Sequence, residues 1–284
     1  MPHKTITFAH SPDPDDAFMF YGFHCGKVSI PGYRIRHVIK DIETLNKRAL
    51  QSRYDVTAIS AASYPAVAKD YWILSVGTSM GRRYGPSIVC RPETACKLRS
   101  SDWNGLRIAV PGRFTTANLL LRLYRKNFKS IETRFDKILS LVKKGAVDGG
   151  LIIHEGQLTY KQMGLSRAVD LGEWWYRKTG LPIPLGLDII KKKLGRPLAE
   201  QVARAFLESI RCAMAHPREA MKYALKFGRG IGTKTGTRFV RMYVNKDTLY
   251  LDEEGRKSLK TLYASARKAG FLKKSVSLEF IDPV

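Results

Sequence analysis

Strand-like and helix-like segments alternate along the first part of the chain, and this rhythm restricts the fold more than any other feature. Apolar patterns typical of strands occur at residues 5–10, 33–40, 54–60 and 71–80. Helical patterns lie between them, at 16–26 and at 41–53, where Asp41 is suited to cap the helix. Repeated strand–helix–strand units are typical of a mostly parallel sheet with helices on both faces. We therefore expect an α/β fold.

A second α/β unit begins near residue 100. Residues 107–110 predict a strand, residues 115–128 an amphipathic helix, and residues 136–145 a helix that ends at a glycine. Residues 180–190 contain two prolines, which exclude a regular helix and predict an extended crossing segment. The chain thus repeats its strand–helix rhythm in a second, smaller unit.

Helical patterns dominate after residue 190, and the alternation does not return. We expect these helices to pack back on the first sheet, which gives two lobes joined by two crossing segments. A chain of 284 residues is long enough for about two domains. The first lobe would contain residues 1–99 and 190–284, and the second lobe residues 100–189.

The chain is strongly basic. It has 49 lysines and arginines against 25 aspartates and glutamates, a formal net charge of +24. Such a surplus favours nucleic acid, an anionic membrane or an anionic small ligand as a partner. Residues 222–246 hold seven basic residues and no acidic one, yet the sequence has no helix-turn-helix, RNP or zinc-finger motif. A solvated basic surface is therefore preferred to specific nucleic-acid binding, which stays as an alternative.

Targeting and cysteine patterns indicate a cytoplasmic protein. No apolar run approaches the roughly 20 residues of a membrane-spanning helix, and the first residues do not form a secretory signal. The cysteines are Cys25, Cys90, Cys96 and Cys212. They form no CxxC pair and no cluster with histidine at zinc-ligand spacing, so we expect reduced thiols and no metal site. The oligomeric state is not predicted by the sequence.

Polar residues follow four of the predicted strands, at the edge where open α/β sheets bind ligands. The first group lies in HSPDPDD and includes Ser11 and Asp16, and the second is Ser60. In GRFTT, Thr115 and Thr116 stand where a helix starts, so backbone N–H groups and hydroxyls there can bind a carboxylate or phosphate. The alternative is that Thr115 only caps its helix. Arg113 is a candidate to hold an anion, or is simply exposed.

His154 is the fourth polar group, directly after the apolar residues 151–153. An imidazole with an ordinary pKa near 6.5 can accept a proton at physiological pH and so act as a general base. The alternative is a hydrogen-bonded interior histidine. Glu155 follows it, and because neighbouring residues on a strand point to opposite faces, direct assistance by Glu155 is disfavoured. The aromatic residues 174–176 and Tyr160 either line a pocket or fill the core.

Five segments of the chain carry a family resemblance that extends from about residue 5 to about residue 280. They read HSPDPDDAFMFYGF, IETLNKRAL, RIAVPGRFTTANLLLRLY, GLIIHEGQLTY and VDLGEWWYRKTGLPIPLG. Together they resemble the 1,4-dihydroxy-6-naphthoate synthase family. The resemblance implies a two-lobed fold like that of type II periplasmic binding proteins, in which each lobe is a small mixed sheet flanked by helices.

The resemblance also implies an activity. The family converts cyclic dehypoxanthinyl futalosine to 1,4-dihydroxy-6-naphthoate on the futalosine route to menaquinone, a lyase reaction that uses no metal and no redox cofactor. It implies that His154 is the base. The residues that it implies as contacts of the small, anionic substrate are Ala58, Ile59, Ser60, Thr115 and Thr116.

The chain departs from the family pattern in its first loop. The family has Ser-Pro-Cys-Pro-Asn-Asp-Thr-Phe there, whereas this chain has Asp13, Asp15 and Ala17 at the third, fifth and seventh positions and keeps Asp16. Ala58 stands where a lysine is common. These changes bear on the substrate or on catalysis more than on the fold, although the new carboxylates can also be capping groups. A binding protein for a small aromatic or anionic carboxylate is therefore the alternative function.

Overall fold

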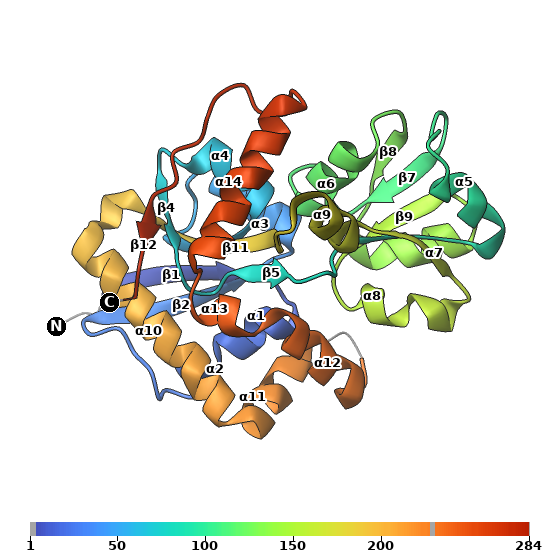
Figure 1. Ribbon diagram of the computed structural model, residues 1–284. Helices are drawn as coiled ribbons and strands as arrows, with labels where there is room; N and C mark the ends of the chain where they lie inside the picture. Colours follow the sequence, from blue (N-terminus) through green and yellow to red (C-terminus); the bar gives the residue numbers. More distant parts are fainter. Residues whose placement is uncertain (1–3, 228–230, 284) are drawn as a thin grey trace.

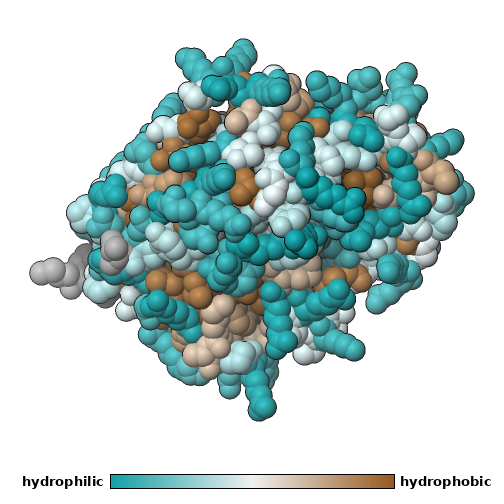
Figure 2. Space-filling model, viewed as in Figure 1, coloured by the Kyte–Doolittle hydropathy of each residue, from teal (hydrophilic) through white to brown (hydrophobic). Residues whose placement is uncertain are grey.

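The computed structural model describes residues 4–227 and 231–283. It has two lobes, each built on its own β-sheet and flanked by helices (Figure 1). Gly228, Arg229 and Gly230, which belong to the basic segment 222–246, lie outside the described residues. Hydrophilic side chains cover most of the face shown in Figure 2, which agrees with a solvated surface.

The first lobe contains a mixed sheet of seven strands, counted over the described residues. Its strands are β1 (Lys4–His10), β2 (Tyr33–Ile39), β3 (Val56–Ser60), β4 (Tyr71–Leu74), β5 (Ser79–Gly81), β11 (Ile183–Lys191) and β12 (Phe280–Ile281). The strand order is β12-β4-β11-β3-β1-β2, with β5 also paired to β11. The strands β2, β1 and β3 are parallel, but β11 runs antiparallel to β3, β4 and β5. The expectation of a mostly parallel sheet is therefore wrong, because the chain returns from the second lobe along the middle of this sheet.

The second lobe contains a five-stranded sheet in the order β10-β6-β9-β7-β8. Its strands are β6 (Ser87–Cys90), β7 (Arg107–Val110), β8 (Lys129–Glu132), β9 (Gly149–Ile152) and β10 (Ser166–Asp170). The strands β8, β7 and β9 are parallel, whereas β6 is antiparallel to β9 and β10. Each lobe is thus a mixed sheet, as the family resemblance implied.

The division between the sheets does not coincide with the expected boundaries at 99/100 and 189/190. Strand β6 belongs to the second sheet, so the chain enters the second lobe before residue 87, and β11 already belongs to the first sheet. The expected boundary was misplaced because β6 is buried along its whole length. A short apolar run predicts a buried strand but does not indicate which sheet the strand joins. The segment between β5 and β6 lies close to the residues that follow β10, since a Cβ on Gly172 would lie 2.1 Å from the carbonyl carbon of Tyr84.

Helices cover both sheets. The first lobe has α1 (Pro14–Met19), α2 (Tyr21–His24), α3 (Ile42–Ala49), α4 (Tyr64–Val67), α10 (Arg196–Ala215), α11 (Pro217–Ala224), α12 (Thr233–Tyr243), α13 (Lys246–Leu249) and α14 (Glu253–Lys268). The second has α5 (Ala95–Arg99), α6 (Thr116–Tyr124), α7 (Ile138–Lys143), α8 (Gly156–Thr159) and α9 (Leu171–Thr179). Asp41 caps α3 by accepting from the Thr44 N–H at 3.0 Å, as predicted. The C-terminal helices α10 to α14 lie on the first lobe, as expected (Figure 1).

Two predicted elements are divided in the structure. The expected helix over 16–26 is two short helices, α1 and α2, and the expected strand over 71–80 is β4 and β5 with a break between them. The break contains Gly77, whose φ of +81° is in the left-handed region that an ordinary strand does not visit.

Three of the aromatic residues considered as pocket walls, Trp174, Trp175 and Tyr160, belong to the core, whereas Tyr176 is half-buried and its hydroxyl accepts from Arg83. Trp175 is buried and its indole N–H donates to the Pro182 carbonyl at 3.2 Å. Trp174 packs against the same core, and Tyr160 is buried in the core of the second lobe. Among the helices of the described residues, none is long and apolar enough to cross a bilayer.

Candidate functional site

A cavity of about 120 Å³ lies between the lobes. First-lobe residues lining it include Ser11, Asp13, Asp15, Asp16, Ala58, Ile59, Ser60, Gly77, Leu185, Asp188 and Tyr243. Second-lobe residues lining it include Thr115, Thr116, Ala117, Ile153, His154 and Gln157. The polar groups predicted at four strand ends thus meet in one place, with the exception of Arg113. Arg113 is exposed and is not among the lining residues, so its expected part in the site is not supported.

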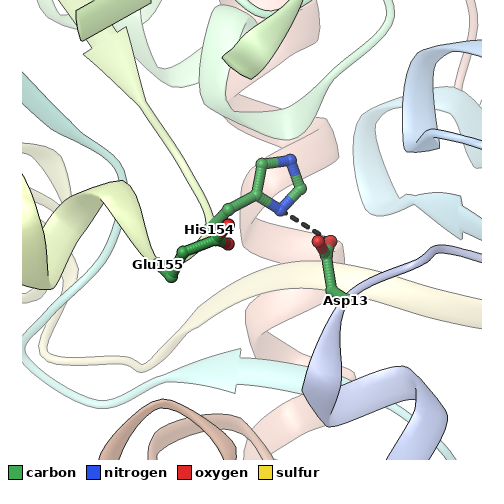
Figure 3. Close-up of side chains that lie close together, drawn as sticks. All are labelled: Asp13, His154 and Glu155. Carbon is green, nitrogen blue, oxygen red and sulfur yellow. Dashed lines mark ion pairs between the residues drawn. The ribbon is translucent and has the colours of Figure 1, made fainter. Parts of the chain in front are cut away.

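His154 projects from the turn that follows β9. Its φ of +65° is left-handed, which is uncommon for a residue with a side chain, and the turn directs the ring towards the first lobe (Figure 3). The ring meets Phe135 edge-on at 4.4 Å between centroids. Its Nδ1 lies 2.6 Å from Oδ2 of Asp13, which belongs to the other lobe. The imidazole is therefore both mostly buried and on the cavity wall.

Asp13 is held in the loop between β1 and α1. The Ser11 hydroxyl donates to its Oδ2 at 2.9 Å, and the Asp13 N–H donates to the Ser11 Oγ at 3.1 Å. Asp13 stands just before α1, but its side chain makes no capping hydrogen bond to that helix, so the capping alternative does not apply to it. Sequence reasoning treated Asp13 only as a departure from a pattern. The signal available in the sequence was the position of Asp13, which follows the first predicted strand at the same sheet edge as the other candidate residues.

Four carboxyl groups form one side of the cavity, here called the carboxyl wall: Asp13, Asp15, Asp16 and Asp188. No lysine or arginine is among the lining residues in the part of the chain that the structure describes. Burial, together with the charge of Asp13, raises the pKa of Asp16 to about 6. Burial and then repulsion from Asp16 also raise the pKa of Asp15 and of Asp188. Asp15, Asp16 and Asp188 therefore retain protons at pH values where exposed aspartates have lost them.

Asp188 is the most enclosed member of this wall. It lies on β11, opposite Ala58 of β3, and is only 3% exposed. Its Oδ1 has no hydrogen-bond partner among the described residues. A Cβ on Gly77 would lie 2.4 Å from the Asp188 Oδ2, so glycine at this position leaves the room that the carboxyl group occupies.

The opposite side is uncharged and is formed by the start of α6: Thr115, Thr116 and Ala117, here called the helix-end wall. Thr115 caps the helix, since its Oγ1 accepts from the Asn118 N–H at 3.2 Å. The Thr116 Oγ1 accepts from Ala62 N at 3.1 Å and donates to the Leu185 carbonyl at 2.8 Å. Both hydroxyls are thus engaged within the protein. The N–H groups of the first helical turn have no partner inside the helix and carry the positive end of its dipole.

Ser60 is fixed by α3. Its N–H donates to Asn46 Oδ1 at 2.8 Å, and Asn46 Nδ2 donates to its Oγ at 3.1 Å. A further contact between the lobes, which sequence reasoning did not find, joins Gln157 Nε2 to the Tyr243 hydroxyl at 3.0 Å. Burial raises the pKa of Tyr243 far above its usual value, so the phenol stays protonated.

Glu155 lies beyond the end of β9, so the argument from opposite strand faces does not apply to it. Donor atoms of Asp13, His154 and Glu155 lie within 4.8 Å of one another (Figure 3). Carboxylate oxygens and an imidazole nitrogen are ligands of several divalent metal ions. This trio is the set of described residues that could hold a metal ion.

Comparison with known proteins decides the family. A family described as "Menaquinone biosynthesis" matches residues 6–268. The chain belongs to this family. It is 39% identical over 267 residues to 1,4-dihydroxy-6-naphthoate synthase of Thermus thermophilus, which covers 94% of this chain and 96% of that one. It is 33% identical over 279 residues to the synthase of Streptomyces coelicolor, with 96% of each chain covered. The protein is accordingly an enzyme of menaquinone biosynthesis, and the resemblance seen in the sequence is confirmed.

Solved structures confirm the fold. A crystal structure of an Archaeoglobus fulgidus protein matches with a TM-score of 0.88 and 45% identity, over 94% of this chain and 98% of that one. The alkanesulfonate-binding protein of Xanthomonas axonopodis matches with a TM-score of 0.71 and 12% identity, over 97% and 96% of the two chains. The second likeness concerns the fold alone, and it confirms the two-lobed periplasmic-binding-protein architecture.

Proposed function

We propose that the protein converts cyclic dehypoxanthinyl futalosine to 1,4-dihydroxy-6-naphthoate, with His154 as the general base. One observation carries the proposal: in a member of the menaquinone family, the imidazole of the IIHE motif lies on the wall of the cavity between the lobes. The high identity to two synthases over nearly their whole length supports the same substrate.

The histidine begins the reaction by accepting a proton from a hydroxyl group or carbon of the substrate. Its Nε2 is buried and has no hydrogen-bond partner among the described residues, so this nitrogen is available to the substrate. If the proton comes from a hydroxyl group, the O–H electron pair forms a carbonyl bond as the neighbouring carbon–carbon bond breaks. The electron pair of that bond passes to the departing carbon, which takes the proton back from the imidazolium. A positioned general base of this kind typically contributes a factor of about 10² to 10⁴ in rate.

The two walls suggest how the substrate is oriented. The helix-end wall offers unpaired N–H groups to the substrate carboxylate. The carboxyl wall repels an anion but pairs with hydroxyl groups, which both donate and accept hydrogen bonds. We propose that the small anionic substrate lies with its carboxylate at α6 and its hydroxyl groups at Asp15, Asp16 and Asp188. Ser60 lines the cavity between these ends.

Turnover of cyclic dehypoxanthinyl futalosine by the purified protein tests the proposal. We expect formation of 1,4-dihydroxy-6-naphthoate, measured by chromatography, and a loss of about 10² to 10⁴ in kcat for His154→Ala. His216→Ala is the matched control because His216 lies between α10 and α11, outside the cavity, and should keep its activity. Absence of product, or full activity of His154→Ala, would refute the proposal. Binding without turnover would instead support a binding protein for a small carboxylate.

We further propose that the reaction needs no metal or redox cofactor and takes place in the cytoplasm. A metal ion at the Asp13, His154 and Glu155 trio would occupy a nitrogen of the proposed base. The expected result is that activity survives dialysis against a chelator. Activity that is lost on chelation and restored by Zn²⁺ or Mn²⁺ would replace the metal-free reaction with a metal-dependent one.

A further inference from the structure

We propose that Asp13 is a positioning residue for His154 and that closure of the two lobes assembles the pair. The proposal rests on the function proposed for His154, but it assigns to Asp13 a role of its own. Figure 3 shows the two side chains facing each other from different elements, the loop before α1 and the turn after β9. The distance between Asp13 Oδ2 and His154 Nδ1 is 2.6 Å, and both groups are largely buried.

The contact selects one tautomer of the neutral ring. A carboxylate only accepts hydrogen bonds, so its partner Nδ1 must carry the proton. In a neutral imidazole the other nitrogen is then an acceptor. That nitrogen, Nε2, is buried and unpartnered among the described residues. Asp13 therefore leaves the free lone pair of His154 on the atom that is available to the substrate.

The contact also fixes the direction of the ring. Phe135 touches the imidazole from the second lobe, and Asp13 reaches it from the first. Asp13 is itself fixed by the Ser11 hydroxyl and makes no capping bond to α1. Replacement of its side chain should therefore leave α1 intact, while it removes the partner of His154 and of the Ser11 hydroxyl.

Closure follows from the size of the cavity. Its volume of about 120 Å³ is well below the roughly 300 Å³ at the lower end of ligand pockets, which favours a movement of the lobes when a substrate enters. Because Asp13 and His154 belong to different lobes, parting the lobes separates them. The base thus acquires its partner only when the site is shut and water is excluded. Gln157 and Tyr243 form a second contact across the same gap.

Three variants separate positioning from closure. Asp13→Ala should lower kcat by about 10- to 100-fold with KM within threefold. Asp13→Asn is nearly isosteric, but its amide can donate to Nδ1 and so favour the opposite tautomer, as known for triads in which the aspartate is replaced. We therefore expect Asp13→Asn to be no more active than Asp13→Ala. Gln157→Ala removes a contact between the lobes and a side chain of the cavity wall, but it leaves the Asp13–His154 pair in place, so it should raise KM more than it lowers kcat.

Nitrogen-15 NMR of histidine-labelled protein supplies a readout that does not depend on turnover. In wild type saturated with 1,4-dihydroxy-6-naphthoate, the His154 signals should show a protonated Nδ1. Asp13→Asn should shift the population towards protonated Nε2, and Gln157→Ala should leave it unchanged at saturation. A protonated Nε2 in wild type, or an Asp13→Asn variant with kcat within twofold of wild type, would overturn the role of Asp13. Inactive wild type with the expected NMR result would refute the proposed reaction but not the pair.

Discussion

The two walls of the cavity differ in charge and in how they are built. The carboxyl wall brings four acidic groups together from the β1–α1 loop, the first turn of α1 and β11, whereas the polar groups of the helix-end wall are backbone and hydroxyl groups. In the carboxyl wall, burial raises the pKa of Asp16, so its carboxyl group keeps a proton to a higher pH. The helix-end wall presents the positive end of the α6 dipole. The comparison shows that the net charge of +24 says nothing about the charge of the cavity, because the lysines and arginines are not among its lining residues. An anion is suited to only one end of this cavity.

The helix-end wall should be the more sensitive to a small change. In Thr116→Val the hydroxyl is lost while the shape is kept, so the Ala62 N–H and the Leu185 carbonyl both lose a partner. Each unsatisfied buried group costs about 1–3 kcal/mol, and we expect the free energy of unfolding to fall by about 2–4 kcal/mol. Urea unfolding measures this change. Thr261→Val removes an exposed hydroxyl bonded only within α14 and should cost no more than about 0.5 kcal/mol. If Thr116→Val and Thr261→Val lowered the free energy of unfolding equally, the helix-end wall would not be especially sensitive to the loss of a hydroxyl group.

The carboxyl wall should destabilise the protein as the pH rises. Folding raises the pKa of Asp188, so the native state holds a proton that the unfolded state has lost above about pH 4. The contribution of Asp188 to the free energy of unfolding is therefore most favourable at low pH, and it declines as the pH rises towards the folded pKa. Asp16, whose folded pKa is about 6, adds to the decline between about pH 4 and pH 6.

Asp188→Asn removes this dependence and should raise the free energy of unfolding at pH 7, because the neutral amide gives up no proton as the pH rises. His10, whose pKa burial lowers to about 4, acts with the opposite sign over the same range. Because His10 is present in both proteins, its effect cancels when the free energy of unfolding of wild type is subtracted from that of Asp188→Asn. Thermal unfolding from pH 4 to pH 7 measures it, with Glu208→Gln on the surface of α10 as the control. A variant less stable than wild type at pH 7 would show that Asp188 is ionised and well paired.

Arg113→Ala should have the smallest effect. The residue is exposed and outside the cavity, so KM should change by less than twofold and the free energy of unfolding by less than about 0.5 kcal/mol. Steady-state kinetics checks the first value and urea unfolding the second. A tenfold rise in KM would place the guanidinium group beside the bound substrate. The helix-end wall would then include a positively charged side chain.

Much of the site could be predicted because strand ends have a fixed place in such folds. Ser60, Thr116 and His154 each follow a strand, and parallel strands of one sheet present their carboxyl ends at one edge. The cap at Thr115 was also readable, because a threonine before an apolar helical pattern is a local signal. For Arg113 the exposed alternative agrees with the structure, because nearness to a motif in sequence does not fix the direction of a long side chain.

Local patterns determined the α/β elements, the second unit and the helical C-terminal third, because hydrophobic periodicity is a property of neighbouring residues. Only the tertiary structure placed β6 in the second sheet and β11 in the middle of the first. It alone joined Asp13 to His154 and brought Asp188 to the same cavity. These contacts depend on how the two lobes pack against each other, and no periodic pattern along one segment carries that information.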